Sequence, residues 1–499
     1  MSSIPQKSGT GTASAPGTGT AEGFIGSVFK YSISTFVNMG IMGLTIILTG
    51  LFVPTGVNGQ IGIFTSWTGT IMTIAILGLD QALIRFFNEP PAGLKRSGLF
   101  RLCFYFSSAA VLVAGALCST LLLRPIYRAL GFTMVGSWAV PLLFLNAFFY
   151  MIARYFNVLY RMEGNIRVYT AESILMQFFY KLFVLLGVFF GGDNPVPAMV
   201  LCSVCGLGAF ALVFSFLRRD ALRPRPAEFK SGGYKTILPY GLAIAPTAVL
   251  LTFNYSYTNT FLNTHLGEDP AGIYGFAYQL SNIVSMVQGG FAAFWGPYMF
   301  EHYKTEQERI KRVHNYLNFV ILVFFAALVA FEDVAFIIFS KYAAALPVFP
   351  LMMLSAVFTI LCETTVYGNA IARKPIYDTL GYALSFAVNV AGLWLLATGR
   401  LGLYGAAIAI AAANFAMFLL RTITAQRLYR SIESPAQTAV AILIAVALAV
   451  AGTVWAHQFL LKLAASAIAA GLYCLLYRKQ LGRLWQLGLG ILRGLLKKP

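Results

Sequence analysis

Apolar stretches of about 20 residues recur along nearly the whole chain, and each is long enough to cross a hydrocarbon core about 30 Å thick. No water is present there to satisfy backbone N–H and C=O groups, so a crossing segment must be a helix or a strand of a closed barrel. Barrel strands alternate apolar and polar residues, and segments such as Ala439–Ala456 do not. Charged residues make up only 11% of 499 positions, against about 25% in a soluble domain. The sequence therefore predicts an all-α membrane protein.

The hydropathy pattern predicts about fourteen transmembrane helices. In chain order they are 25–50, 61–81, 98–122, 138–160, 169–190, 196–217, 236–262, 272–299, 313–332, 346–369, 378–398, 403–424, 436–456 and 460–477.

Lys and Arg are distributed unevenly over the predicted loops. With the N-terminus in the cytoplasm, 30 of the 36 lie in inner segments and the span ends beside them, while Lys181 falls inside a span. The outer loops hold Arg124, Arg128, Lys341, Arg400 and Lys462. Because cytoplasmic loops carry an excess of Lys and Arg, we expect both termini in the cytoplasm. The net charge of +18 then faces anionic lipid, and no nucleic-acid partner is needed to explain it.

Three short sequence matches recur at nearly one spacing. They pair Tyr31 with Tyr240, Gly62-Ile63-Phe64 with Gly272-Ile273-Tyr274, and Asn157-x-x-x-Arg161 with Asn369-x-x-x-Arg373, at offsets of 209, 210 and 212. An even number of spans separates the copies, so the two halves should share one orientation, as in transporters with parallel repeats. We predict two six-helix lobes at 24–217 and 236–424, a basic cytoplasmic linker at 218–235, and two additional helices within 425–477.

The two ends of the chain lack apolar spans. Residues 1–23, rich in Ser, Gly, Thr and Ala, are predicted to form a disordered cytoplasmic tail. Residues 478–499 mix Leu and Trp with Arg and Lys, which is typical of an interfacial amphipathic helix. A plain basic tail is the alternative, because several glycines weaken helix propensity there.

Catalytic and metal-binding patterns are missing from the sequence. Cys202 and Cys205 form a C-x-x-C without a companion His or Cys cluster, which favours packing in an apolar helix. The four histidines show no metal-ligand spacing. No G-x-x-x-x-G-K-[ST] loop occurs, and the longest outer loop, 123–137, lacks an acidic pair. We therefore expect a transporter without a cofactor rather than an enzyme.

Three segments resemble bacterial polysaccharide flippases, in the order found in that family. They are Gly78–Phe86 after the second span, Ala271–Ala277 at the start of the eighth, and Phe294–Phe300 at its end. On these segments the chain resembles, over roughly residues 24–430, the Wzx-like, oligosaccharidyl-lipid branch of the multidrug/oligosaccharidyl-lipid/polysaccharide exporter superfamily. One departure is Asn259-Thr260, which stands where many relatives show an acidic–basic pair.

The resemblance implies a function and a location. Proteins of that branch carry undecaprenyl-pyrophosphate-linked oligosaccharides from the cytoplasmic to the outer leaflet of the bacterial cytoplasmic (inner) membrane. Such a protein is expected to work beside a polysaccharide polymerase and chain-length machinery, for O-antigen lipopolysaccharide, capsule, exopolysaccharide or a teichuronic-type polymer.

Cations in or beside spans are the candidates for binding the pyrophosphate, because charges within the bilayer are costly and usually functional. They are Lys181, Arg85, Arg154 and Lys30. Lys181 lies within the fifth span, and its alternative role is a pair with an acid on a neighbouring helix. The other three lie near cytoplasmic span ends, where snorkelling to the lipid interface is the alternative. Our working hypothesis is a potential-assisted or ion-independent flippase with a cationic cavity centred on Lys181.

Two further sets of residues complete the candidate site. Asn254, Tyr255, Tyr257 and Asn259 of the seventh span are candidates for sugar contact, with interhelical contact as the alternative. Asp80, Glu172 and Glu363 are acids in or near spans and are candidates to carry a coupling proton. Asp80 is also close enough to the interface to be merely solvated or paired with Arg85.

Two other functions in the same superfamily stay open. A lipid II flippase also has fourteen spans, but its first span typically carries several cations, whereas Ile33–Phe52 carries none. A multidrug or cation antiporter favours acidic cavities and usually has twelve spans.

Overall fold

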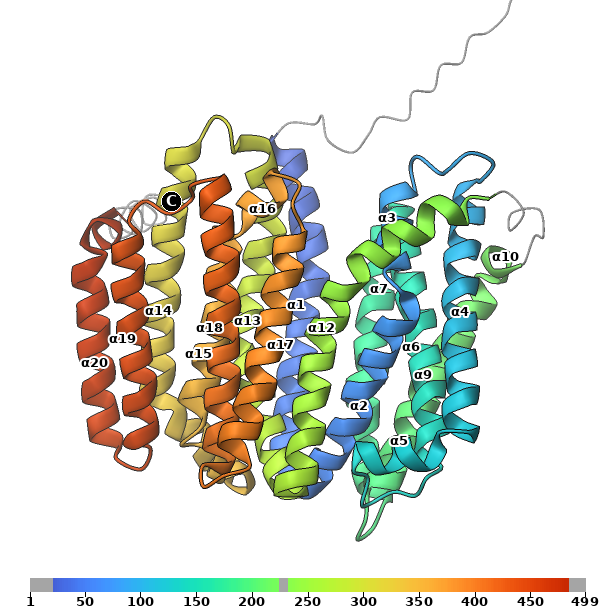
Figure 1. Cartoon of the computed structure of the whole chain (residues 1–499), viewed down its shortest axis with the longest axis horizontal. Coiled ribbons are helices and arrows are strands. Elements are labelled where there is room, and N and C mark those ends of the chain that lie inside the picture. Colours follow the sequence, from blue (N-terminus) through green and yellow to red (C-terminus); the bar gives the residue numbers. More distant parts are fainter. Residues whose placement is uncertain (1–20, 224–231, 484–499) are drawn as a thin grey trace, which may run out of the picture.

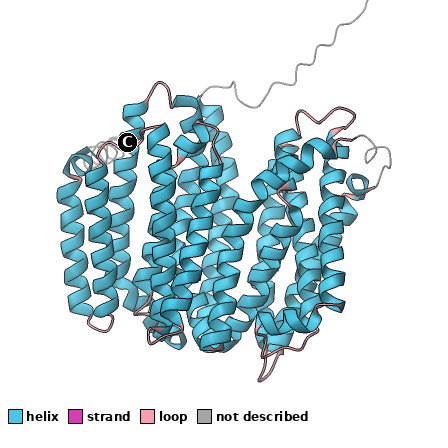
Figure 2. Cartoon of the chain, in the orientation of Figure 1, coloured by secondary structure: helices cyan, strands magenta, loops and turns pink. Residues whose placement is uncertain are grey.

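The computed structural model describes residues 21–223 and 232–483, and within them every regular element is helical (Figures 1 and 2). The predicted tails at 1–23 and 478–499 and the linker at 218–235 lie largely or partly outside the described residues.

The first half of the chain runs from α1 to α10. Its helices are α1 (Ala21–Phe52), α2 (Thr55–Ile76), α3 (Leu79–Phe86), α4 (Arg96–Thr120), α5 (Leu123–Leu130), α6 (Ala139–Met162), α7 (Ile166–Gln177), the π-helical η1 (Phe178–Leu182), α8 (Phe183–Phe190), α9 (Val196–Leu217) and α10 (Arg219–Leu222).

The second half runs from α12 to α20. Its helices are α12 (Tyr234–Leu266), α13 (Glu268–His302), α14 (Gln307–Ile338), the 3-10 helix η2 (Ser340–Ala345), α15 (Phe349–Thr365), α16 (Tyr367–Ile371), α17 (Ile376–Gly392), the π-helical η3 (Leu393–Ala397), α18 (Gly402–Leu428), α19 (Pro435–Val454) and α20 (Phe459–Leu476).

Among the described residues, eleven helices are long and apolar enough to cross a membrane, or twelve if the bent pair α2–α3 counts as one. That pair replaces the predicted second span at 61–81, and its two helices meet at 53°. The break falls at Leu77 and Gly78, which both have positive φ, 51° and 70°. Gly78 also touches the backbone of Gly241 in α12, where any Cβ would collide. Glycine is required at this break for both reasons.

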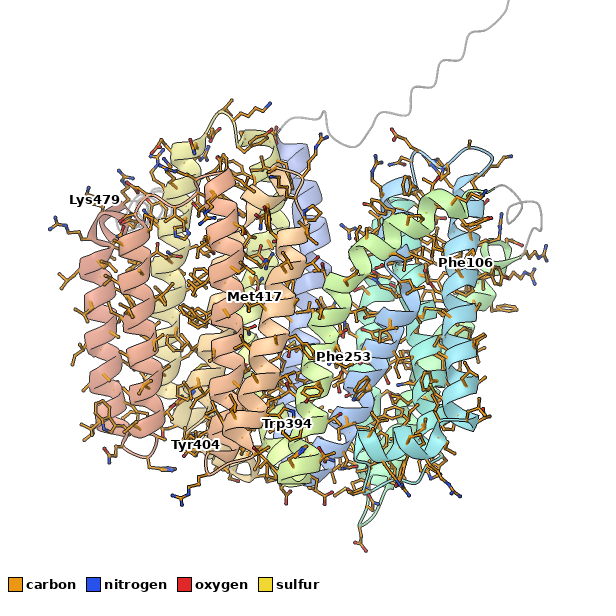
Figure 3. All side chains as sticks on the ribbon, in the orientation of Figure 1. Phe106, Phe253, Trp394, Tyr404, Met417 and Lys479 are labelled. Atoms are coloured by element: carbon orange, nitrogen blue, oxygen red, sulfur yellow. The ribbon has the colours of Figure 1, made fainter. Side chains whose placement is uncertain are left out.

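The two halves diverge toward the end at which α1 begins and approach each other at the opposite end (Figure 1). Helix α1 contacts both halves. Its Asn38 donates to Ser173 of α7 at 2.9 Å, and Tyr342 of η2 donates to the carbonyl of Val53, directly after α1, at 3.0 Å. Phe253 of α12 also lies between the halves, packing edge-on against Trp67 of α2 and against Phe386 of α17 (Figure 3).

We call the place where the two halves meet the inter-half junction; α2 packs there against α12 and α13. The backbones of Gly59 and Gly272 touch, so a side chain at either position would collide with the facing helix. The polar contacts around them join Thr55 to Asp269 (2.5 Å), Asn58 to the Gly272 carbonyl (2.9 Å), Gln60 to Asn263 (2.8 Å), Thr133 to Glu268 (2.5 Å), Trp67 to Thr260 (2.8 Å) and Thr70 to Ser256 (2.8 Å). Hydrogen bonds rather than a continuous apolar seam therefore hold this end together.

Helices α19 and α20 pack against α14 at the far edge of the second half (Figure 1). Lys462, counted above among the outer-loop cations although the predicted span at 460–477 contains it, lies in α20 with its side chain completely buried. Its Nζ lies 3.1 Å from Glu332 Oε1 and 2.5 Å from Asp333 Oδ2, both on α14. A buried ion cluster thus fixes the last helix to the rest of the bundle.

Candidate functional site

Lys181 lies in η1, the π-helical turn between α7 and α8. Such turns interrupt regular α-helical bonding and are frequent at functional sites. The side chain is exposed, and Nζ lies 5.3 Å from the centroid of the Tyr180 ring. Within residues 21–223 and 232–483, no carboxylate forms an ion pair with it. The neutralising acid considered as its alternative partner is therefore not found in the described part of the chain.

A cavity of about 70 Å³ adjoins Lys181, and we call it the lysine cavity. Its polar lining consists of Thr45, Thr49, Asn58, Thr65, Tyr180, Lys181 and Gln279. Gln279 belongs to α13 of the second half, whereas the others belong to the first half. Tyr180 is fixed by a hydrogen bond to the Thr65 carbonyl at 3.0 Å and by stacking on Tyr150 at 4.5 Å. The lysine cavity therefore presents one cation, hydroxyls and amides where the two halves face each other.

A second cavity, of about 250 Å³, lies within the second half, and we call it the tyrosine cavity. Its polar lining consists of Asn254, Tyr255, Thr258, Tyr274, Tyr278, Ser281, Asn282, Gln288, Ser355, Thr359, Tyr382, Ser385 and Asn414. None of these side chains carries a formal charge at neutral pH. Helix α13 borders both cavities, with Gln279 on the lysine cavity and Tyr278 on the tyrosine cavity. Tyr278 stacks on Tyr255 at 4.5 Å.

The four sugar-contact candidates occupy different surroundings. Asn254 and Tyr255 line the tyrosine cavity, and Asn254 accepts a hydrogen bond from Asn389 at 2.8 Å. Tyr257 accepts one from Trp394 at 3.1 Å and does not line that cavity. Asn259 is buried, with 3% of its surface exposed, and lines neither cavity. The structure thus brings together only the first two.

Two of the three cation candidates near span ends have acidic neighbours. Arg154 holds Asp80 through two hydrogen bonds, at 3.1 Å from Nε and 2.8 Å from Nη2, which ties α6 to α3. Arg85 is exposed on α3 and lies 3.7 Å from Glu89. The partner of Asp80 is therefore Arg154, and not Arg85 as its position in the sequence suggested. Lys30 lies in the part of α1 whose side chains are not described.

The remaining acid candidates lie in separate halves. Glu172 of α7 is completely buried and accepts a hydrogen bond from Asn157 at 2.6 Å. Its other oxygen, Oε1, has no hydrogen-bond partner among the described residues. Glu363 of α15 is half-buried and accepts a hydrogen bond from Gln288 at 2.6 Å. A buried carboxylate with an unsatisfied oxygen is costly when ionised, so Glu172 is the acid best suited to hold a proton.

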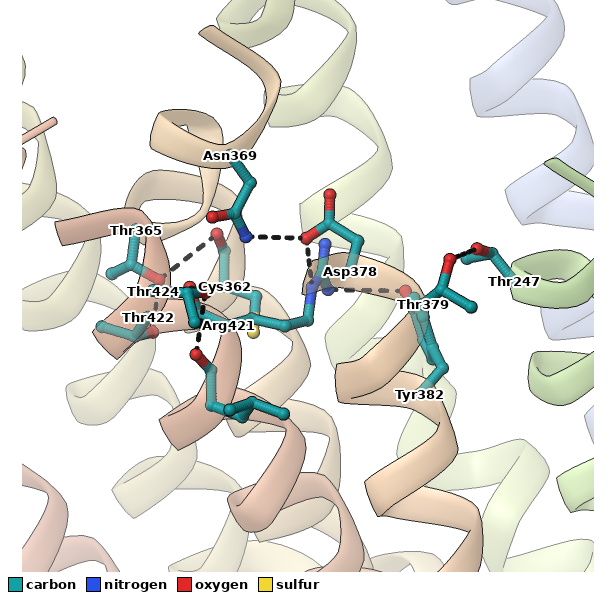
Figure 4. Close-up of polar contacts among 11 residues, drawn as sticks. Thr247, Cys362, Thr365, Asn369, Asp378, Thr379, Tyr382, Arg421, Thr422 and Thr424 are labelled. Atoms are coloured by element: carbon teal, nitrogen blue, oxygen red, sulfur yellow. Dashed lines mark hydrogen bonds and ion pairs between the residues drawn. The ribbon is translucent and has the colours of Figure 1, made fainter. Parts of the chain in front are cut away.

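Sequence reasoning missed a polar cluster in the second half (Figure 4). Arg421 Nε of α18 lies 2.9 Å from Asp378 Oδ1 of α17, and Asn369 donates to the same oxygen at 3.1 Å. The guanidinium lies 5.0 Å from the ring centroid of Tyr382, which lines the tyrosine cavity. The sequence did indicate this cluster, because Arg421 is a cation within the predicted span at 403–424.

The helix arrangement is similar to that of solved membrane transporters. The structure of "Lipid II flippase MurJ, inward closed conformation" superposes with a TM-score of 0.65 at 11% identity, covering 90% of this chain and 99% of that one. The MATE multidrug transporter DinF-BH, in a ligand complex, superposes with a TM-score of 0.57 at 18% identity, covering 80% and 95%. An inward-facing multidrug resistance MATE family transporter of the MOP superfamily gives 0.53 at 14%, covering 78% and 94%. These likenesses define the fold.

Residues 25–303, more than half of the chain, match the model of a family described as polysaccharide biosynthesis protein, and the chain belongs to that family. No curated protein sequence matches the chain significantly. The chain thus combines membership of a polysaccharide biosynthesis family with a fold that solved membrane transporters share.

Proposed function

We propose that the protein moves undecaprenyl-pyrophosphate-linked oligosaccharide from the cytoplasmic to the outer leaflet by alternating access. The observation that carries the proposal is Lys181, an intramembrane cation without an acidic partner in the described residues, in a cavity shared by both halves. Intramembrane cations normally pair with an acid or mark a transport path. Here a pyrophosphate supplies the missing negative charge.

The lysine cavity suits a phosphate group. Its ammonium complements the negative charge, and the hydroxyls of Thr45, Thr49 and Thr65 border the same space. In the membrane interior a charge-assisted hydrogen bond is stronger than in water, because the surroundings screen it less.

The tyrosine cavity suits a saccharide. Sugars are neutral, carry many hydroxyls and present apolar ring faces, so they need donors, acceptors and aromatic surfaces rather than charge. Asn254 and Tyr255 supply these functions at the wall shared by α12 and α17. The cavity borders a different face of α13 from the one that bears Gln279, and in our proposal the glycan extends into it from the pyrophosphate.

The proposal includes fourteen spans in two six-helix lobes with a parallel repeat. Asn157, in the first copy of the predicted repeat, donates to an acid on the helix that follows it, and so does Asn369 in the second copy. The fifth and eleventh spans each contain one π-helical turn, η1 and η3. Helices α1 and α13, added to the eleven apolar helices and the bent pair α2–α3, make fourteen spans. The lobes are 24–217 and 236–424, followed by the additional helices within 425–477.

Alternating access requires the inter-half junction to open. Its contacts are mostly hydrogen bonds, which exchange for bonds to water at modest net cost when the halves separate. In our proposal this junction is the outer gate, the termini are cytoplasmic, and the protein lies in the bacterial inner membrane. A polysaccharide polymerase and chain-length machinery receive the product on the outer face.

Mass spectrometry of polyprenyl-linked intermediates, in cells with and without the gene, tests this function. Completed undecaprenyl-pyrophosphate oligosaccharide should accumulate in the deletion strain while surface polymer is lost. The same mass spectrum gives the composition of the glycan. An unchanged lipid-linked pool contradicts the proposal.

The same experiment separates the two alternatives. Accumulation of lipid II identifies a peptidoglycan precursor flippase. An unchanged pool combined with altered resistance to cationic compounds identifies a multidrug or cation antiporter.

A further inference from the structure

An apolar groove of about 230 Å³ lies between α1 and the fifth span, and we call it the α1–α8 groove. Its lining is entirely apolar and consists of Leu44, Leu48, Phe52, Val53, Phe178, Leu182, Phe183, Leu185, Leu186, Val188 and Phe189. Several of these residues are exposed, Phe189 by 64% and Leu44 by 46%. The rings of Phe52 and Phe189, 5.6 Å apart, lie at one end of it. The groove therefore opens toward the hydrocarbon of the bilayer.

The α1–α8 groove adjoins the lysine cavity. Val53 and Leu185 line both spaces. On α1, Leu44 and Leu48 face the groove, while the next residues in sequence, Thr45 and Thr49, face the cavity. Spacings of four residues keep each set on one face of the helix.

The fifth span shows the same division. Lys181 and Val184 line the cavity, whereas Leu182 and Leu186 line the groove. One pair of helices thus separates a cationic site from a lipid-facing apolar surface. The π-helical turn η1 contributes Lys181 to the cavity and Leu182 to the groove.

We propose that the α1–α8 groove seats the isoprenoid chain of the substrate while its phosphate contacts Lys181. The inference rests on the proposed function for the identity of the ligand. A polyprenyl phosphate joins a long apolar chain to an anion, and it needs adjoining sites of these two kinds. Drawing the chain into the polar cavities would leave apolar surface in contact with water, which is unfavourable. Threading it between α1 and α8 keeps the chain in lipid while the headgroup occupies the cavity.

Photo-cross-linking tests the position of the chain. A benzophenone amino acid is placed at Leu44 or Leu186 in the groove, and at Leu212 of α9 or Leu443 of α19 as controls that are each 66% exposed. The protein is reconstituted in vesicles of phosphatidylethanolamine and phosphatidylglycerol that contain undecaprenyl phosphate, and adducts are counted by mass spectrometry. We expect roughly tenfold more adduct in the groove than at the controls, the ratio of a 1.4 kcal/mol preference. Equal labelling at the controls overturns the proposal.

The role of Lys181 is tested in the same assay. Lys181→Gln should reduce groove labelling by undecaprenyl phosphate, and uncharged undecaprenol should label the groove no more than the controls. If neither Lys181→Gln nor the use of undecaprenol lowers the labelling, the groove makes only an ordinary lipid contact, and the proposal is overturned.

A groove-filling variant gives a second measurement. Leu186→Trp should weaken binding of undecaprenyl phosphate and leave binding of short, water-soluble dimethylallyl phosphate unchanged, because only the long chain needs the groove. Equal loss for both ligands overturns the proposal. These assays measure binding, not transport. If the groove is labelled specifically but deletion of the gene leaves the lipid-linked pool unchanged, the proposal for the groove is supported and only the transport function is contradicted.

Discussion

The ammonium of Lys462 lies 3.1 Å from Glu332 Oε1, and neither side chain has any exposed surface. The two residues are separated by 130 positions and join α20 to α14. Removing one partner of a buried pair leaves the other charge uncompensated, at a cost of about 3–5 kcal/mol. We expect Lys462→Met to lower the free energy of unfolding by that amount, measured by denaturation of the purified protein in detergent.

Arg400→Met, which removes an exposed cation at the α17–α18 turn, is the control and should change stability by less than about 0.5 kcal/mol. Adding Glu332→Gln to Lys462→Met should restore part of the loss. Wild-type stability of the single Lys462→Met variant would show that the buried pair does not hold α20.

The inter-half junction should be lockable by a disulfide. Thr55 Oγ1 donates to Asp269 Oδ1 at 2.5 Å, so the two side chains meet across the junction and cysteines in their place face each other. We expect the double variant Thr55→Cys/Asp269→Cys to stop exporting substrate under oxidising conditions and to resume export when the disulfide is reduced. Thr365→Cys/Thr422→Cys joins α15 to α18 within the second half, and should export normally when oxidised. Export through an oxidised junction would show that this end does not open.

Asp80 and Arg154 should behave as a coupled pair. Their bidentate contact is partly exposed, so a double-mutant cycle with Asp80→Asn and Arg154→Gln should give a coupling of about 1 kcal/mol in stability. If Arg154 only positions α3, the two single variants should reduce export equally. A much larger loss of export for Arg154→Gln would assign that arginine a direct contact with substrate.

Glu172 is the acid whose substitution most directly tests proton coupling. Glu172→Gln keeps an oxygen to accept from Asn157 and removes the titratable group. If transport uses a proton at this site, export should lose its dependence on external pH in the variant, while Glu363→Gln should retain it. An unchanged pH profile in Glu172→Gln removes that residue from coupling and favours potential-driven or product-driven transport.

The helical membrane fold was predictable because each span satisfies its own backbone bonds and shows its hydropathy locally. The break at Leu77–Gly78 was not, since it depends on the contact of Gly78 with the distant Gly241. The predicted span at 313–332 also ended too early, because α14 continues to Ile338. Asp333 was therefore assigned to a loop, and its ion pair with Lys462 was missed.

The candidate site was predictable only in part. Lys181 was found because a lysine inside an apolar span is conspicuous, and the same argument applied to Arg421 would have found its pair with Asp378. The partner of Asp80 was not predictable, since Arg154 lies 74 positions away and Arg85 only five. Which face of the seventh span borders a cavity also depends on how α12 packs against α13 and α17.

The most direct test of the central claim is export by Lys181 variants in cells that lack the native gene. Mass spectrometry of the lipid-linked pool should show substrate accumulating with Lys181→Met, and much less with Lys181→Arg, which preserves the charge. Immunoblotting must show equal amounts of both variants in the membrane. Full export by Lys181→Met would contradict the claim that the lysine cavity carries the pyrophosphate.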